Sequence, residues 1–180
     1  MDFAKVLDTV SRFLDEHGYR YVLVGAFALA AHGLSRATQD VDFAIEARAQ
    51  PDLVSFLESL GYETIYRSEG YSNHAHALPA LGRVDVIYVG EPTGTKLFKG
   101  ATTVTVSGKA VRVPRPEHLA AMKVLAMKND PMRTFQEMAD LQHILALPGI
   151  DAEEIRGYFE RHGLSEKYDE IRRILDSAQP

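Results

Sequence analysis

The chain has 180 residues, of which 46 % are hydrophobic and 25 % are charged, the composition of a folded globular protein. Its formal net charge of −5 excludes a surface coated in positive charge, so a nucleic-acid partner would have to meet a local basic patch. The absence of cysteine excludes disulfides and thiolate metal sites. The sequence shows no signal-peptide pattern and no apolar run of membrane-spanning length, so we expect a cytoplasmic protein with no membrane partner.

The first elements alternate between helix and strand. Apolar residues recur at helical spacing over residues 3–17, which predicts an amphipathic helix that ends at Gly18. Residues 21–24 form a short apolar run, typical of a buried strand. Gly25 ends that run, and residues 26–31 are nearly all apolar, which predicts a short buried helix.

Strict alternation over residues 39–46 predicts a strand with two different faces. Val41, Phe43 and Ile45 fall on one face, and Asp40 and Asp42 fall on the other together with Glu46. Two carboxylates at a spacing of two repel each other unless a cation lies between them. Mg²⁺ is the usual cation, because it takes oxygen ligands and keeps positions open for substrate phosphates.

The next segment completes a mixed sheet. Pro51 begins a predicted helix that ends at Gly61, and residues 62–66 and 75–78 are predicted strands around a polar turn at residues 69–73. A strand over residues 83–89 follows, with Asp85 on the face opposite its large apolar residues. This order predicts an α+β fold, a mixed β-sheet with packed helices.

His74 and His76 alternate on one predicted strand face, which is also the spacing of a metal-binding pair. No third ligand lies nearby in the sequence, so a structural role is favoured over a zinc site.

The strand, the glycine-led turn into a helix and the Asp-x-Asp strand together resemble the nucleotidyltransferase superfamily of polymerase-β type. The resemblance implies that the Gly25–Ala26 turn contacts the phosphates of a nucleotide. It also implies that Asp40 and Asp42, joined by Asp85, hold Mg²⁺. Ala26 departs from the family pattern, where Gly or Ser is found, and cannot offer a hydroxyl group.

Residues 90–100 predict a turn and a short helix, and residues 102–113 predict a hairpin. This part of the chain holds the densest positive charge, which we call the basic window: Lys96, Lys99, Lys109, Arg112 and Arg115. The window has two interpretations. It is either a solvated edge protected by lysines or a track for a polyanionic acceptor such as RNA.

A predicted helix over residues 116–127 is apolar on all sides except at Lys123. A lone lysine in a buried helix either extends its ammonium group to solvent or meets an anion. In both cases Lys123→Met is expected to be neutral or stabilising for the fold without nucleotide.

The chain from about Tyr21 to Leu145 also resembles the AbiEii-like (abortive-infection) toxins of bacterial toxin–antitoxin pairs. The resemblance rests on an Arg36-x-Thr38-x-Asp40-x-Asp42 run and on later residues of two helices, which are Lys123, Lys128, Arg133, Glu137 and Asp140-Leu141. It implies that Arg36, Thr38 and Lys123 bind the nucleotide and that Lys123 and Asp140 are catalytic. It also implies a cognate antitoxin as a possible partner.

Two further helices are predicted, over residues 151–162 and from Ser165 onward. We therefore expect a nucleotidyltransferase core over residues 1–115 and a C-terminal helical subdomain over residues 116–180.

The expected activity is Mg²⁺-dependent transfer of a nucleoside monophosphate from an NTP to a hydroxyl group. The favoured acceptor is the end of an RNA such as tRNA, as in a toxin. Transfer to a small molecule such as an antibiotic is a second interpretation, and a non-catalytic binding protein with the same fold is a third. All three metal carboxylates are present, which disfavours the third.

Overall fold

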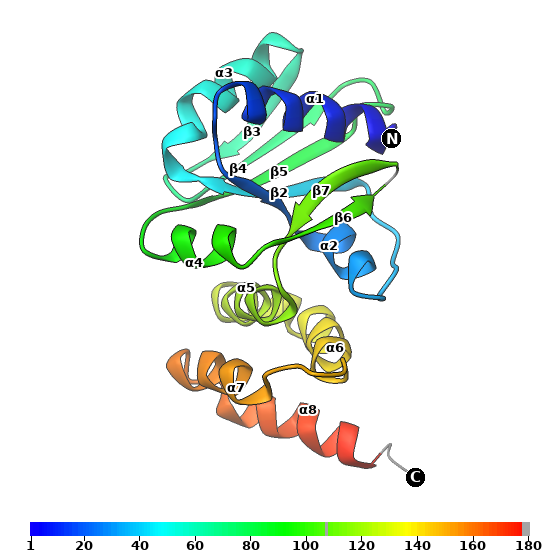
Figure 1. Ribbon diagram of the computed structural model, residues 1–180, viewed down its shortest axis with the longest axis vertical. Coiled ribbons are helices and arrows are strands. Elements are labelled where there is room, and N and C mark those ends of the chain that lie inside the picture. Colours follow the sequence, from blue (N-terminus) through cyan, green and yellow to red (C-terminus); the bar gives the residue numbers. More distant parts are fainter. Residues whose placement is uncertain (107, 178–180) are drawn as a thin grey trace. The chain divides into compact units, whose positions relative to one another are not determined.

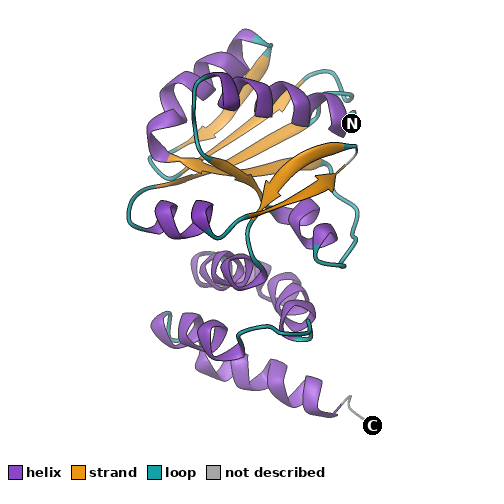
Figure 2. Ribbon diagram, viewed as in Figure 1, coloured by secondary structure: helices purple, strands orange, loops and turns teal. Residues whose placement is uncertain are grey.

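The computed structural model of the protein describes residues 1–106 and 108–177 (Figure 1). The chain divides into two compact units, Met1–Pro114 and Arg115–Pro180. The first unit combines a sheet with helices, and the second contains helices among its described residues (Figure 2).

The first unit is built on a five-stranded sheet with the strand order β1-β2-β5-β4-β3. The strands are β1 (Tyr21–Leu23), β2 (Asp40–Glu46), β3 (Tyr62–Arg67), β4 (Tyr71–His76) and β5 (Arg83–Val89). Strands β2 and β5 pair in parallel, whereas the other neighbouring strands pair antiparallel. The predicted mixed sheet and the α+β fold class are therefore confirmed.

Two helices cover one face of this sheet, α1 (Phe3–Glu16) and α3 (Gln50–Ser59) (Figure 1). Most of their apolar side chains are buried, and Phe13 of α1 stacks on Phe56 of α3 with ring centroids 4.1 Å apart. We call this side of the sheet the helix-covered face. The side chains of Val84, Val86 and Tyr88 in β5 are buried, while Asp85 between them belongs to the opposite face.

The remaining elements of the first unit are short: α2 (Gly25–Ala31), a 3₁₀ turn (Ala47–Ala49), α4 (Thr93–Lys99) and the two-stranded sheet of β6 (Thr102–Val106) and β7 (Lys109–Val113). The two helices and the two strands agree with the predicted elements within a few residues, whereas the 3₁₀ turn was not predicted. Ser107, which belongs to the predicted hairpin turn, lies outside the described residues.

The prediction for β4 was wrong in its position. The sequence predicted a turn at residues 69–73 and a strand at residues 75–78, but β4 begins at Tyr71 and ends at His76. The turn is tighter than expected, because the Ser68 amide donates to the Tyr71 carbonyl oxygen at 2.8 Å. Ser72 and His74 are thereby fully buried on the helix-covered face.

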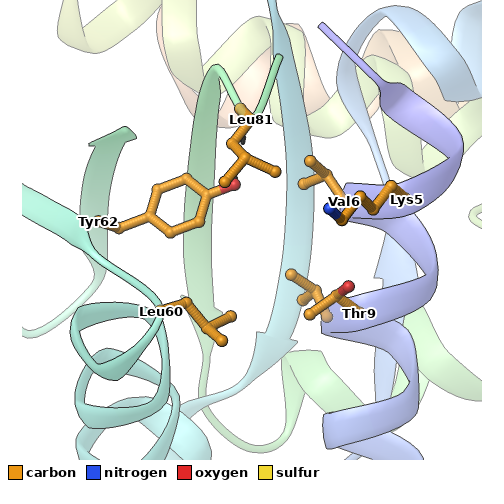
Figure 3. A pocket seen from close by; sticks show the side chains of 7 residues that line it. Lys5, Val6, Thr9, Leu60, Tyr62 and Leu81 are labelled. Atoms are coloured by element: carbon orange, nitrogen blue, oxygen red, sulfur yellow. Dashed lines mark hydrogen bonds between the residues drawn. The ribbon is translucent and has the colours of Figure 1, made fainter. Parts of the chain in front are cut away.

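A small pocket also lies on the helix-covered face (Figure 3). Lys5, Val6 and Thr9 of α1 stand opposite Leu60, Tyr62 and Leu81 across a cavity of about 190 Å³. The Tyr62 hydroxyl donates to the Leu81 carbonyl oxygen at 2.9 Å, so its polar group is already bonded. The cavity is smaller than typical ligand sites of about 300–1,000 Å³, and it lies on the side of the sheet away from Asp85.

The second unit consists of α5 (Pro116–Asn129), a 3₁₀ turn (Pro131–Arg133), α6 (Thr134–Leu145), α7 (Ala152–Arg161) and α8 (Ser165–Ser177). Its core is formed by fully buried residues of these helices, among them Val124, Leu141, Ile144, Ile155, Phe159 and Ile171. Asp151 caps α7 as predicted, its side chain accepting from the Glu154 amide at 2.9 Å. Over the described part of the chain, we find no helix with the length and apolar character needed to cross a membrane.

Candidate metal and nucleotide site

Three carboxylates meet on the face of the sheet opposite α1 and α3. The parallel pairing of β2 with β5 sets Asp42 directly beside Asp85, and Asp40 lies two residues before Asp42 on the same strand face. One carboxylate oxygen from each of the three residues lies within 4.8 Å of the others, and all three side chains are half-buried. We call this cluster the Asp triad.

The donor set of the Asp triad fits a hard divalent cation. It offers carboxylate oxygens only, the ligands that Mg²⁺ takes in phosphoryl-transfer sites. Three neighbouring negative charges repel one another, and a cation between them removes this repulsion.

The pKa of Asp85 is raised from its ordinary value, first by burial and also by the negative charge of Asp40. A hydrogen bond from Asn73, the Arg83 guanidinium and the Tyr71 hydroxyl each act in the opposite direction and lower this pKa. Burial and like charge therefore dominate over the local donors, which is the electrostatic setting that a bound cation would relieve.

Gly25 approaches the Asp triad more closely than any other residue type could. The Val24 amide donates to the Asp42 backbone oxygen at 2.9 Å, which brings the end of β1 against Asp42. Gly25 has φ +59°, and a Cβ placed on it would lie 2.0 Å from Asp42 Oδ2. Its lack of a side chain is required both by the backbone conformation and by the space that Asp42 fills. Ala26 follows as a buried residue of α2.

The two residues predicted from the Arg36-x-Thr38 run differ in their placement. Thr38 lies against the Asp triad, because its hydroxyl donates to Asp40 Oδ1. Arg36 lies in the connection between α2 and β2 and is exposed.

Asn73 of β4 is part of the site and was not predicted from the sequence. Its Nδ2 donates to Asp85 Oδ1 and to the Tyr71 hydroxyl oxygen, both at 2.7 Å. The sequence signal for it is the alternation of Tyr71, Asn73 and Ala75, which identifies one strand face once β4 is known to begin at Tyr71. The prediction placed Asn73 in a turn, so its contact with Asp85 was missed.

Lys123 belongs to the second unit and meets carboxylates of that unit. Its side chain is buried, and Nζ lies 2.9 Å from Glu137 Oε2 and 2.5 Å from Asp140 Oδ2. The Arg133 guanidinium lies 2.6 Å from Glu137 Oε1. We call these four residues the α5–α6 charge cluster. Because Lys123 neutralises two buried carboxylates, the expectation that Lys123→Met is benign is reversed.

Three of the five basic-window residues bond to other groups of the chain. Lys109 Nζ lies 2.5 Å from Asp8 Oδ1, and the Arg112 guanidinium donates to the Phe98 carbonyl oxygen. The Arg115 guanidinium pairs with Glu154. Lys96 and Lys99 remain exposed at the end of α4.

The rings of His74 and His76 are hydrogen-bonded to other groups of the first unit. His74 Nδ1 lies 3.2 Å from Thr64 Oγ1, and its Nε2 lies 2.8 Å from Ser72 Oγ, so both ring nitrogens are bonded inside the fold. His76 Nδ1 accepts from the Leu78 amide at 2.9 Å. These contacts favour the structural interpretation over a zinc pair.

No protein-family model matches the sequence, and a comparison with curated proteins finds no match. Among solved structures, the antibiotic-resistance factor ANT(2″)-Ia aligns with 98 % of this chain and 94 % of its own, at a TM-score of 0.58 and 16 % identity. The lincomycin-bound lincosamide antibiotic adenylyltransferase LnuA aligns with 79 % of this chain and 96 % of its own, at a TM-score of 0.56 and 12 % identity.

An antigenic nucleotidyltransferase-like protein from Paracoccidioides brasiliensis aligns with 93 % of this chain and 92 % of its own, at a TM-score of 0.57 and 17 % identity. At these identities the likeness is one of fold. The chain has the fold of nucleotidyltransferases, and the predicted fold class is confirmed.

Proposed function

We propose that the protein is a Mg²⁺-dependent nucleotidyltransferase that moves a nucleoside monophosphate from an NTP to a hydroxyl group. The observation that carries this proposal is the convergence of Asp40, Asp42 and Asp85 within 4.8 Å, on the sheet face opposite α1 and α3, in a nucleotidyltransferase fold. Such a cluster costs folding free energy unless a cation neutralises it, so a functional role accounts for it better than a structural one.

In this proposal the Asp triad holds the metal, which, when bound, neutralises phosphate charge and orients the NTP. The Gly25–Ala26 turn borders the triad and would contact the phosphates, and Thr38 fixes the Asp40 carboxylate through its hydroxyl. The acceptor oxygen forms a bond to the α-phosphorus, the bond from that phosphorus to the pyrophosphate oxygen breaks, and the acceptor proton is released to solvent. The chain contributes mainly by positioning and charge neutralisation.

Lys123, Asp140 and Arg36 belong to the proposal on the strength of the resemblance alone. Lys123 and Asp140 are bonded to each other in the second unit, and Arg36 is exposed in the first. For Lys123 to bind the triphosphate, its ammonium group would have to give up its ion pair with Glu137 or Asp140. Alternatively, it would have to bind both carboxylates and the nucleotide at the same time.

Two acceptor classes remain. Transfer to RNA, as in an AbiEii-like toxin with a cognate antitoxin, is supported by the sequence resemblance. Transfer to a small molecule is favoured by the charge distribution, because three of the five basic-window side chains bond within the chain. ANT(2″)-Ia has been solved with adenylyl-2″-tobramycin, and LnuA with lincomycin, so proteins of this fold accommodate such acceptors. We favour the small molecule.

The test is an incubation of the purified chain with Mg²⁺ and each of the four α-labelled NTPs, with total tRNA, with a panel of aminoglycosides and lincosamides, or without acceptor. Label appearing in an antibiotic supports the small-molecule acceptor, and label in tRNA supports the toxin. Asp42→Asn is the matched control and should abolish either signal. If no acceptor is labelled but NTP binding depends on Asp42, the result favours the third interpretation, a non-catalytic binding protein.

A further inference from the structure

One row of side chains crosses four strands of the sheet on the face of the Asp triad. The strand registers pair Asp42 with Asp85, Asp85 with Asn73, and Asn73 with Tyr66. Strands β4 and β5 are antiparallel, and side chains directly opposite each other in such a pair have Cβ atoms about 4.5–5.5 Å apart. Asn73 is therefore the immediate neighbour of the third carboxylate, on the side of Asp85 away from Asp42.

Asn73 has both of its amide hydrogens committed. Nδ2 donates to Asp85 Oδ1 at 2.7 Å and to the Tyr71 hydroxyl oxygen at 2.7 Å. Asn73 and Tyr71 are half-buried, and the Asp85 side chain is 12 % exposed. With two acceptors fixed at short distance, the amide plane of Asn73 has little freedom to turn, and it holds the carboxylate that it bonds.

We propose that Asn73 is a positioning residue that fixes the rotation of the Asp85 carboxylate so that the Asp triad is ready to bind its metal ion. The inference rests on the proposed function. Asp85 is the single triad residue supplied by β5, so its orientation relative to the two β2 carboxylates depends on its own contacts. Residues that bond a metal ligand from outside the coordination shell commonly change metal affinity by about 10–100-fold when removed.

The alternative role is a purely structural hydrogen bond that holds β4 against β5. That role and the positioning role differ in what they predict. A structural bond affects the free energy of unfolding, while a positioning bond also affects the affinity of the folded, metal-free protein for a divalent ion. The distinguishing quantity is therefore the Mn²⁺ dissociation constant, measured without nucleotide or acceptor.

The experiment titrates Mn²⁺ into the full, metal-free chain and follows free Mn²⁺ by electron paramagnetic resonance. Asn73→Leu removes the donors and keeps the number and branching of the side-chain heavy atoms, and it should raise the Mn²⁺ dissociation constant about tenfold or more. Ser72→Ala is the matched control on the same strand, since Ser72 bonds His74 and Tyr88 on the helix-covered face. It should leave the dissociation constant within twofold of wild type.

The failure of this inference differs from the failure of the proposed function. If the wild type binds Mn²⁺ no better than Asp42→Asn, there is no metal site and the proposed function fails. If Asp42→Asn loses binding but Asn73→Leu matches the wild type, the metal site stands and the positioning role is overturned. Thermal melts check that each variant is folded, and Asn73→Ala replaces Asn73→Leu if the larger side chain prevents folding.

Discussion

At the scale of single residues, Gly25 is the position of the site that tolerates substitution least. The Asp42 side chain fills the space that a side chain at Gly25 would need. Gly25→Ala adds a methyl group 2.0 Å from Asp42 Oδ2 and forces alanine to φ +59°. The second effect alone costs about 1–2 kcal/mol. We expect a larger loss in the free energy of unfolding, measured by urea titration, together with loss of stabilisation by Mg²⁺.

Gly18→Ala is the matched control for this prediction. Gly18 has φ +65°, but no atom lies within 4 Å of its added Cβ. It therefore reports the cost of the backbone conformation without a steric conflict. An equal loss of stability in the two variants, with Mg²⁺ stabilisation retained in Gly25→Ala, would contradict the close fit of Gly25 and Asp42.

Asp42→Asn should abolish nucleotide transfer and leave the metal-free fold intact. Removing one of three neighbouring negative charges reduces their repulsion, so the melting temperature without metal should hold or rise. The increase in melting temperature on adding Mg²⁺ should disappear. A large loss of stability in the metal-free variant would instead indicate a structural hydrogen bond at Asp42.

At the scale of elements, the α5–α6 charge cluster is a buried ionic contact that a single substitution can break. Lys123→Met leaves Glu137 and Asp140 as buried carboxylates without their common ammonium group. Breaking a buried ion pair from one side costs about 3–5 kcal/mol, and we expect a loss of this size in urea unfolding followed by helical circular dichroism. The triple variant Lys123→Met, Glu137→Gln, Asp140→Asn should recover most of it.

Arg133→Met provides the comparison within the same cluster. Arg133 is 52 % exposed, and Glu137 keeps its bond to Lys123 when Arg133 is removed. Half-exposed ion pairs contribute about 0.2–1 kcal/mol, so its effect should be several times smaller. Wild-type stability in Lys123→Met would show that the two carboxylates are neutralised by something other than Lys123.

His74 in β4 makes the stability of the fold depend on pH. Burial lowers the pKa of His74, so the folded chain keeps this ring neutral at pH values where the unfolded chain, with a pKa of about 6.5, takes up a proton. The unfolded state then binds more protons, and stability falls as the pH drops below about 6.5 toward the lower pKa of the folded state.

His74→Gln should therefore reduce the loss of stability between pH 7 and pH 5, whatever its effect on stability at pH 7. The measurement is the slope of the unfolding free energy against pH in wild type and variant. An identical slope would mean that His74 titrates alike in the folded and unfolded chain.

The sequence predicted the helices and strands better than it predicted the contacts between residues of different elements. Alternation over β2 and β5 placed Asp40, Asp42 and Asp85 on polar strand faces, because side-chain direction along a strand follows local period. The bounds of β4 were predicted wrongly, with Asn73 in a turn, so its contact with Asp85 on the paired strand β5 was missed. The contacts of Lys123 could not be predicted from a local pattern, because its partners lie on another helix, 14 and 17 residues further along the chain.

At the scale of the whole molecule, the distribution of charge favours some acceptors over others. The net charge is −5, and the basic-window residues Lys96 and Lys99 are exposed on α4, where neither forms an ion pair with another residue of the described chain. If tRNA is the acceptor, Lys96→Ala with Lys99→Ala should weaken tRNA binding and reduce the slope of log affinity against log salt by about two. If the acceptor is small, as we favour, the double variant should transfer nucleotide at the wild-type rate.

Filter binding of tRNA between 50 and 200 mM KCl measures the slope of log affinity against log salt concentration. Lys109→Ala is the control, because the ammonium group of Lys109 is paired with Asp8. Strong, salt-sensitive tRNA binding that is lost in the double variant would overturn our preference for a small acceptor.

The parallel register of β2 and β5 also bears on how the chain folds. A slip of β5 by one residue against β2 would turn Asp85 to the helix-covered face and take it away from Asp40 and Asp42. A cation bound by all three carboxylates therefore stabilises only the chain whose two strands are aligned as in the native sheet. Refolding in Mg²⁺ should accordingly raise the yield of correctly aligned protein, with the ion acting as a check on strand alignment before any nucleotide is bound.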